Sequence, residues 1–332
     1  MFIRRMASFA APQNVFHFKR NSELLRLTFT SVVCKKKVLI SALIIMVSLF
    51  IARVTVNDFK EATIVARICP KTFHCLLIKE DRTDSGSILR SLISEVHPDF
   101  MLAQVFITHQ RGWLDMLWRN HYNKIIGSKL TAHYQHAIVA AAFLTGATTG
   151  MNVCDANGRM LFAGVGARPL AHFIHTRCNS IEINELILRN EIWNLTRHWL
   201  GPFSWPIVDG TEFDGVYDVI LFDQCSNYVC PSIALLPTAA SLQRALKDGG
   251  VFITNINAPT KRLIRRNFKR VNRTLSAVYN ACLSIDVHYH TEPNKVFVCG
   301  KGFENTIHLK KTMKKNAKFV FKYLNLSVVS FH

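Results

Sequence analysis

The chain is 332 residues long, enough for one large α/β domain with appendages. Hydrophobic residues make up 49% of it, and 15 glycines and 10 prolines are too few for a chain that is disordered throughout. The formal net charge is +19, but the basic excess is confined to residues 1–60, 261–273 and 301–332. Because the remainder is close to neutral, this charge belongs to the two ends and one helix rather than to the fold itself.

Nine cysteines are spread singly along the chain, with no CxxC pair and no Cys/His spacing typical of a zinc site. We therefore predict no metal centre. An odd number of cysteines within apolar stretches indicates mostly buried free thiols, and the count alone does not define the redox compartment.

An uncharged apolar run, residues 38–52, lies between Lys37 and Arg53. As a helix it spans only about 22 Å, against roughly 30 Å for the hydrocarbon core of a bilayer. Snorkelling of the flanking cations extends its reach, so we predict a membrane anchor over residues 38–56. A buried helix or strand is the alternative. A cleaved signal peptide is disfavoured, because the run begins far from the N-terminus and lacks a good A-x-A site.

Charges beside the run indicate its orientation. Eight Lys or Arg residues precede it, whereas Arg53, Lys60 and Arg67 follow it. This bias predicts a single-pass protein with a cytoplasmic N-terminus and its main domain in the lumen of the secretory pathway. Three glycosylation sequons are compatible with that location; they begin at Asn194, Asn272 and Asn325. A mitochondrial location is the alternative, because residues 1–22 carry Arg, Lys and Ser but no acid.

From about residue 61 the pattern becomes one of short strands. The expected elements are a hairpin of Thr63–Cys69 with Phe73–Lys79, helical spacing over 86–96 and a strand at Met101–Thr108. We assign residues 1–37 to a basic N-terminal segment and residues 57–131 to a small β-rich lid region. An apolar helix, Ala132–Leu144, follows the lid.

A strand, a glycine turn and a helix then follow one another, as in a parallel α/β sheet. Arg159–Ala163 predicts a strand that runs into Gly164-Val165-Gly166, and a helix opens at Pro169. Glycines at such a turn let the backbone approach a ligand closely, with helix N–H groups available beyond. We therefore predict a nucleotide-binding site around Gly164 and Gly166.

Acidic residues after the turn occur in the order expected of a nucleoside site. Ser180–Asn184 predicts a strand with Glu182 at its end, where an acid can accept both ribose hydroxyls. Asp209, followed by Gly210, is placed to bind an adenine amino group. Asp223 ends the apolar strand Tyr217–Asp223, at the sheet edge that faces the ligand crevice. Each acid alone is equally well read as a surface charge or a turn residue, but the ordered set favours a nucleoside site.

The remaining predicted elements complete the sheet. They are a helix over Ser232–Leu246, a sharp turn at Asp248-Gly249-Gly250, a strand over Val251–Asn257, and a hairpin of Ser284–His290 with Lys295–Gly300.

These segments resemble a known family. YDVILFD at 217–223, Cys230-Pro231, LKDGGVFITNI at 246–256 and the closing hairpin are similar to the spermidine-synthase-like class I S-adenosylmethionine-dependent methyltransferases. The resemblance is closest to the C-terminal half of the dual methyltransferases that act on translation elongation factor 1-alpha. It covers residues 60–300 and implies a Rossmann-like, seven-stranded, mostly parallel sheet over 132–300, with helices on both faces.

By that resemblance, Gly164 and Gly166 flank the methionine part of S-adenosylmethionine, Glu182 binds its ribose, and Asp209 with Gly210 its adenine. Asp223 matches the acid that, in aminopropyltransferases, helps to deprotonate an attacking amine. The expected function is that of a membrane-anchored methyltransferase acting on an amine in a protein substrate. A homodimer is compatible with these features.

Two departures from the family pattern support alternative functions. Arg168 follows the glycine turn and brings a cation towards the position of a sulfonium ligand. The stretch 224–227 lacks the second acid that polyamine-forming enzymes use. The alternatives are a polyamine aminopropyltransferase that uses decarboxylated S-adenosylmethionine, and a catalytically inactive Rossmann module that acts as an interaction protein.

The basic run 261–273 has apolar residues at helical spacing, which predicts a helix with one packed face. Its opposite face presents seven cations, which form either a solvated surface or a dock for an acidic partner or an anionic surface. Without a zinc module or an aromatic-lined groove, sequence-specific nucleic-acid binding is not expected. Residues 301–332 form a basic C-terminal tail, whose apolar stretch 319–331 predicts a strand or a peripheral membrane contact.

Overall fold

The computed structural model describes residues 44–48, 63–70, 74–84, 87–98, 101–109, 123–148, 157–186, 190–201, 205–208, 214–223, 233–256, 260–288 and 293–324. The chain divides into two compact units, Met1–Lys60 and Glu61–His332. In the first unit the described residues, 44–48, are helical and exposed. Within the described ranges, no helix combines the length and the apolar character that crossing a membrane requires. The rest of the predicted anchor at 38–56, and all of 1–37, lie outside those ranges.

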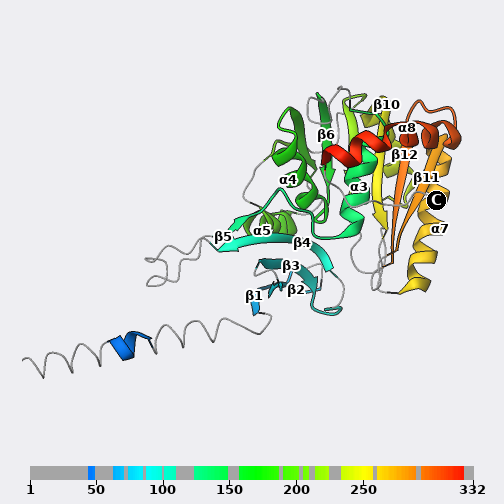
Figure 1. Cartoon of the computed structure of the whole chain (residues 1–332). Helices are drawn as coiled ribbons and strands as arrows, with labels where there is room; N and C mark the ends of the chain where they lie inside the picture. The colour runs from blue at the N-terminus through cyan, green and yellow to red at the C-terminus, as the bar shows by residue number, and fades with distance from the viewer. Residues whose placement is uncertain are drawn as a thin grey trace, which may run out of the picture. The chain divides into compact units, whose positions relative to one another are not determined.

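The second unit begins with a five-stranded antiparallel sheet in the order β1-β2-β3-β4-β5 (Figure 1). Its strands are β1 (Thr63–Ile68), β2 (Leu76–Arg82), β3 (Ile88–Ser94), β4 (Met101–His109) and β5 (Asn123–Ile125). The predicted hairpin and the predicted strand at 101–108 are confirmed, but the helical spacing read over 86–96 is wrong. Strand β3 is buried at six of its seven positions. A strand covered on both faces carries no simple apolar–polar alternation, so its pattern resembles that of a helix.

The main sheet has seven strands in the order β11-β12-β10-β9-β6-β7-β8. They are β6 (Gly158–Ala163), β7 (Ile181–Leu186), β8 (Ile207–Val208), β9 (Tyr217–Phe222), β10 (Leu246–Ile256), β11 (Ala281–His288) and β12 (Pro293–Gly300). Strands β6 to β10 pair in parallel, whereas β12 runs antiparallel to both β10 and β11. The predicted seven-stranded, mostly parallel sheet is confirmed.

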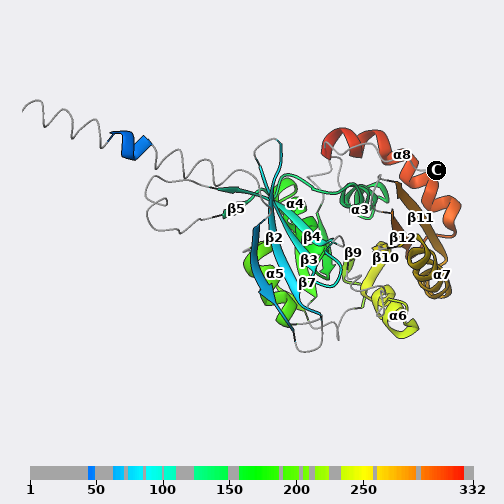
Figure 2. The same cartoon turned by 90° about the horizontal axis from the view of Figure 1, so that it is seen from below.

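Side chains that alternate along each strand build one core on each face of this sheet. Met160 and Phe162 of β6 join the core under α3 (His133–Leu144), α4 (Ala167–Arg177) and α8 (Thr306–Leu324). Leu161 and Ala163 join the core under α6 (Leu236–Ala245) and α7 (Lys261–Val278). Figure 2 shows α3 and α8 on one side of β10–β12, with α6 and α7 on the other.

The two basic segments of the C-terminal region are both helical. Helix α7 buries Ile264, Val271 and Leu275 and exposes six cations, namely Arg262, Arg265, Arg266, Lys269, Arg270 and Arg273. Helix α8 buries Leu309, Met313 and Val320 in the core that it shares with α3. The segment 319–324 is therefore helical rather than a strand, because these apolar residues repeat at helical spacing towards α3.

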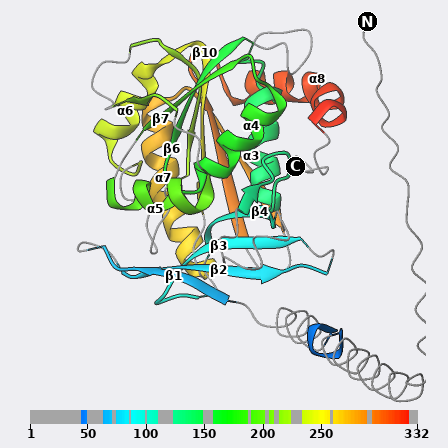
Figure 3. The ribbon, with the colours of Figure 1, turned by 90° about the vertical axis from the view of Figure 1, so that its left-hand side faces the viewer.

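The five-stranded sheet forms a separate layer beneath the main sheet, beside α5 (Asn190–Leu200) (Figure 3). Arg90 of β3 connects this layer to α5. It is 4% exposed, pairs with Glu80, and donates a hydrogen bond of 3.1 Å to the carbonyl of Trp199 in α5. Leu200 and Val165 pack on the apolar cluster of the same layer. Since Val165 lies in the glycine turn, the small sheet contacts the predicted site directly.

Two disulfide bonds occur in the described part of the chain. Cys69–Cys75 closes the turn between β1 and β2, and Cys282–Cys299 joins directly paired positions of β11 and β12. The prediction of mostly free thiols is therefore wrong for these four cysteines, whereas Cys178 is buried and takes part in neither disulfide. The pairing register brings Cys282 opposite Cys299, which the spacing along the sequence does not reveal. The remaining cysteines lie outside the described ranges; they are Cys34, Cys154, Cys225 and Cys230.

Candidate functional site

Strand order locates the candidate site. Strands β6 and β9 are neighbours, and from them the chain proceeds in opposite directions, to β7 and β8 on one side and to β10, β12 and β11 on the other. In open α/β sheets, ligands bind outside the carboxyl ends of the strands at such a reversal. At this point lie the turn 164–166, which follows β6, and Asp223, which follows β9.

The glycine turn needs its two glycines for different reasons. Gly164 has a φ of +97°, a conformation that other residues rarely adopt. Gly166 precedes α4, and its N–H donates a 3.1 Å hydrogen bond to the backbone carbonyl of Asp223. A Cβ at Gly166 would lie 2.2 Å from Oδ2 of Asp223, so a side chain there would displace that carboxyl. The structure thus brings Gly164, Gly166 and Asp223 together.

Asp223 is a buried acid, 6% exposed. The side chains of Tyr134 from α3 and Asn255 from β10 hydrogen-bond its carboxyl, but its Oδ2 has no hydrogen-bond partner among the described residues. Burial raises the pKa of Asp223 to about 7, and the two hydrogen bonds oppose that rise. Neither Tyr134 nor Asn255 was predicted as a site residue. For Asn255, its position as a polar residue within the apolar strand 251–256 was the available signal.

Glu182 lies away from this edge of the sheet. Strand β7 begins at Ile181 and continues to Leu186, so the prediction that Glu182 ends the strand is wrong. Glu182 is paired in register with Arg159 near the amino end of β6, and their side chains form a half-exposed ion pair of 2.8 Å. The error arose because Asn184 and Glu185 are polar and resemble a strand end, yet both are buried within β7.

Glu185 is the acid that β7 carries to the crevice edge, in register with Phe162. Its Oε1 accepts a hydrogen bond from Nη1 of Arg168 at 2.9 Å. Its Oε2 accepts from the same nitrogen at 3.2 Å and from Nε1 of Trp193 at 3.1 Å. Neither Arg168 nor Glu185 was predicted to form this pair, because 17 residues separate them and only the packing of α4 on β7 brings them together.

Arg168 is itself held on several sides. Its Nη2 donates a 2.9 Å hydrogen bond to the carbonyl of Gly201, and its guanidinium lies 5.8 Å from the ring centre of Trp205. The side chain is fully buried. Burial lowers the pKa of Arg168, while the Glu185 carboxylate opposes that shift. The cation expected beside a sulfonium ligand is instead directed to Glu185.

Asp209 and Gly210, the predicted adenine-binding residues, lie outside the described ranges, as do Gln224–Asn227 after Asp223. Strand β8, which pairs with the carboxyl end of β7, ends at Val208.

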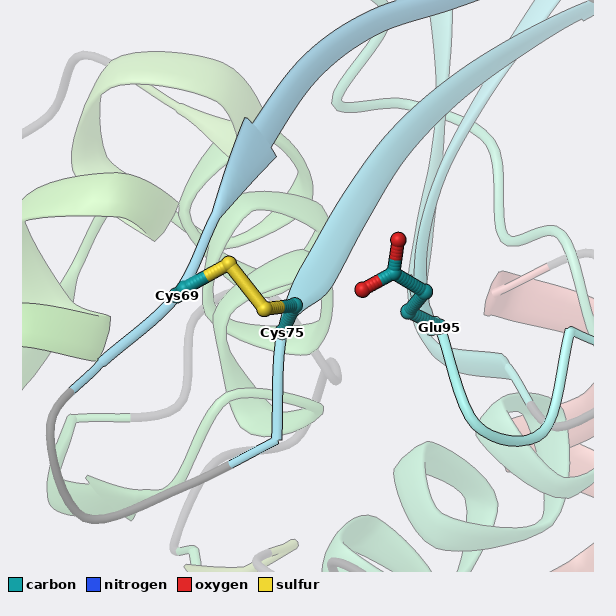
Figure 4. A group of neighbouring side chains, drawn as sticks. All are labelled: Cys69, Cys75 and Glu95. Carbon is teal, nitrogen blue, oxygen red and sulfur yellow. A yellow bond between two sulfur atoms is a disulfide. The ribbon is translucent and has the colours of Figure 1, made fainter.

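A second cluster lies at the disulfide of the small sheet, where Glu95 stands beside Cys69 and Cys75 (Figure 4). The two sulfur atoms are bonded to each other and offer no thiolate. Glu95 forms a 2.8 Å ion pair with Arg67, which lowers the pKa of Glu95. These contacts fully account for the cluster without a metal ion.

No protein-family model and no curated protein matches the sequence. Among solved structures, a probable spermidine synthase from Corynebacterium glutamicum is similar, with a TM-score of 0.52 and 14% identity over 81% of this chain and 99% of that one. The spermidine synthase from Thermotoga maritima has a TM-score of 0.48 and 14% identity, over 79% and 87%. Human Methyltransferase-like protein 13 in complex with SAH has a TM-score of 0.45 and 21% identity, over 61% and 96%. The first of these shows that the chain has a spermidine-synthase-like fold.

Proposed function

We propose that this chain binds S-adenosylmethionine at the carboxyl ends of β6 and β9 and transfers its methyl group to an amine. One observation carries the proposal: the Oδ2 of Asp223 is buried, has no hydrogen-bond partner in the described residues, and lies against Gly166 at the strand-order reversal. A buried polar atom without a partner costs free energy, so it indicates a group kept for function. A carboxyl whose pKa is strongly shifted in such a crevice supports the same conclusion.

The residues of the glycine turn suit the amino-acid part of this cosubstrate. Gly164 and Gly166 place no side chain over the turn, and the N-terminus of α4 beyond them favours a carboxylate. When bound, the cosubstrate supplies a methyl group made electrophilic by a sulfonium cation. Asp223 provides the nearby negative charge for that cation. For the ribose, the position at the crevice edge belongs to Glu185 rather than to Glu182.

The expected chemistry is a single displacement. The amine nitrogen attacks the methyl carbon, the carbon–sulfur electron pair remains on sulfur, and the nitrogen releases a proton. Asp223 lies at this edge of the sheet and can orient the amine and accept that proton. Its pKa of about 7 suits this role, because a base is most effective when its pKa lies near the working pH. A neighbouring sulfonium cation further favours its ionised form.

A binding assay and a transfer assay test the proposal together. Full-length protein is titrated with S-adenosylhomocysteine, and labelled S-adenosylmethionine is supplied with extracts of cells that lack the protein. Asp223→Asn is expected to keep ligand affinity within about threefold while lowering methyl transfer by ~10²–10⁴-fold, the usual worth of a positioned base. Glu182→Gln, at the opposite edge of the sheet, is the matched control.

Three results would change the assignment. Transfer by Asp223→Asn within about threefold of wild type would remove Asp223 from the chemistry. Formation of spermidine from putrescine and decarboxylated S-adenosylmethionine would replace methyl transfer by aminopropyl transfer. Failure of every variant, including those described below, to bind the nucleoside would favour an inactive interaction module.

We also propose a membrane-anchored domain in an oxidising lumen, with an amine of a protein as the methyl acceptor. The charge bias around 38–52 supports the orientation. The two disulfides, Cys69–Cys75 and Cys282–Cys299, are typical of secretory compartments and rare in the cytosol. Asn194 and Asn272, the acceptor residues of two sequons, are both exposed.

A further inference from the structure

The acid at the carboxyl end of β7 is already engaged by the protein. Glu185 stands where, in nucleoside-binding α/β sheets, an acid accepts hydrogen bonds from ribose hydroxyls. An ionised carboxylate offers about four acceptor positions on its two oxygens. Three are used here, two by Nη1 of Arg168 and one by Nε1 of Trp193. Roughly one position remains, which is too few for both hydroxyls of a ribose.

The packing around Arg168 holds this arrangement closed. The guanidinium also bonds the carbonyl of Gly201, directly after α5, and lies against Trp205. Gly201 in turn stands against His172 of α4, where a Cβ would lie 1.7 Å from the imidazole Nε2. Arg168 is fully buried and Glu185 is 8% exposed by side chain, so solvent does not compete for either charge. Release of Glu185 therefore requires Arg168 to leave several partners together.

We propose that the Arg168–Glu185 pair is a latch that closes the ribose part of the site, so that a nucleoside cosubstrate binds weakly until Arg168 releases the acid. This inference rests on the proposed function, because it assigns a control to the same site. The latch explains why an arginine follows the glycine turn, although a cation at this position does not favour binding of a sulfonium ligand. Movement of α5, which carries Trp193 and ends beside Gly201, would open it.

A double-mutant cycle on the full-length protein tests the latch, with calorimetric titration of S-adenosylhomocysteine as the readout. Arg168→Met removes the guanidinium but keeps an unbranched apolar side chain. It should tighten binding of S-adenosylhomocysteine by about 10- to 100-fold, which corresponds to a fraction of the free energy needed to separate a buried ion pair. Adding Glu185→Gln to Arg168→Met should remove that gain, since the freed acid is the source of the new affinity.

The chain provides a matched control. Arg159 and Glu182 form an ion pair of 2.8 Å, close to the 2.9 Å of the Arg168–Glu185 pair. It joins β6 and β7 near their amino ends and is half exposed. Arg159→Met should therefore leave the affinity for S-adenosylhomocysteine within about twofold of wild type, because exposed pairs contribute little. Thermal unfolding of each variant verifies that it is folded. If Arg168→Met does not fold, Arg168→Lys keeps the charge but not the fork and should tighten binding by about 3- to 10-fold.

The outcomes separate the latch from the proposed function. Tight binding by wild type that Glu185→Gln weakens would overturn the latch and leave the function in place. Unchanged weak binding in Arg168→Met and Arg168→Lys would also overturn it. Absence of binding in wild type and in both variants would overturn the proposed function, and the latch with it. Tightening that persists in the Arg168→Met/Glu185→Gln double variant would show that Glu185 is not the acid released.

Discussion

Asp223 should make the stability of this protein fall as the pH rises. Burial raises the pKa of its carboxyl to about 7, compared with 3.8 for an exposed one. The folded state therefore binds more protons than the unfolded state between these values. By linkage, the free energy of unfolding is unaffected by this group well below pH 4, decreases as the pH rises through 7, and levels off above it.

The size of this effect follows from the shift. A difference of roughly three pKa units, at about 1.4 kcal/mol each, corresponds to about 4 kcal/mol above pH 8. Asp223→Asn replaces the carboxyl by a neutral group of the same shape. We therefore expect the variant to match wild type near pH 4 and to be more stable by about 2–4 kcal/mol at pH 8.5, the lower figure allowing for relaxation around the charge.

Urea unfolding of the two proteins at a series of pH values measures this difference directly. Asp248→Asn, which removes a carboxylate that is 93% exposed by side chain, controls for the change in net charge. A stability difference that is the same at pH 4 and pH 8.5 would refute the reasoning. So would a wild-type protein that is more stable than Asp223→Asn at the higher pH, because it would mean that the buried carboxylate is fully compensated.

Three further predictions concern the turn, the disulfide and the location. Gly166→Ala should lower the free energy of unfolding by about 1–3 kcal/mol and abolish binding of S-adenosylhomocysteine, since its Cβ would lie 2.2 Å from Oδ2 of Asp223; calorimetry that finds unchanged affinity would contradict this. Replacing Cys282 and Cys299 by Ser should cost about 2–4 kcal/mol in urea unfolding, and alkylation of these thiols without reductant would show that the bond is absent. A glycosidase-sensitive mass shift should disappear in Asn194→Gln or Asn272→Gln, whereas protease protection found only in purified mitochondria would support the mitochondrial alternative.

Local sequence was sufficient to place the glycine turn and Asp223. Each depends on a short apolar strand followed at once by a glycine or an acid, and such a segment forms the same structure wherever the sheet places it. The same holds for α3 and for the two hairpins, whose strands pair with their neighbours along the chain. The parallel pairing of the central strands followed from the alternation of strands and helices, because a crossover helix returns the chain in the same direction.

Tertiary structure alone decided which acid reaches the crevice and what that acid contacts. Glu182 and Glu185 are both carboxylates in one short segment, and they lie at opposite ends of β7 because this strand continues in register with β6 as far as Leu186. A buried carboxylate such as Glu185 is tolerated in a strand only when a cation compensates its charge. That cation comes from Arg168, on another element, and no local pattern records the pairing. The bond between Cys282 and Cys299 could not be predicted from local sequence for the same reason. Contacts between distant residues depend on how packed elements align, and not on the residues beside them in the chain.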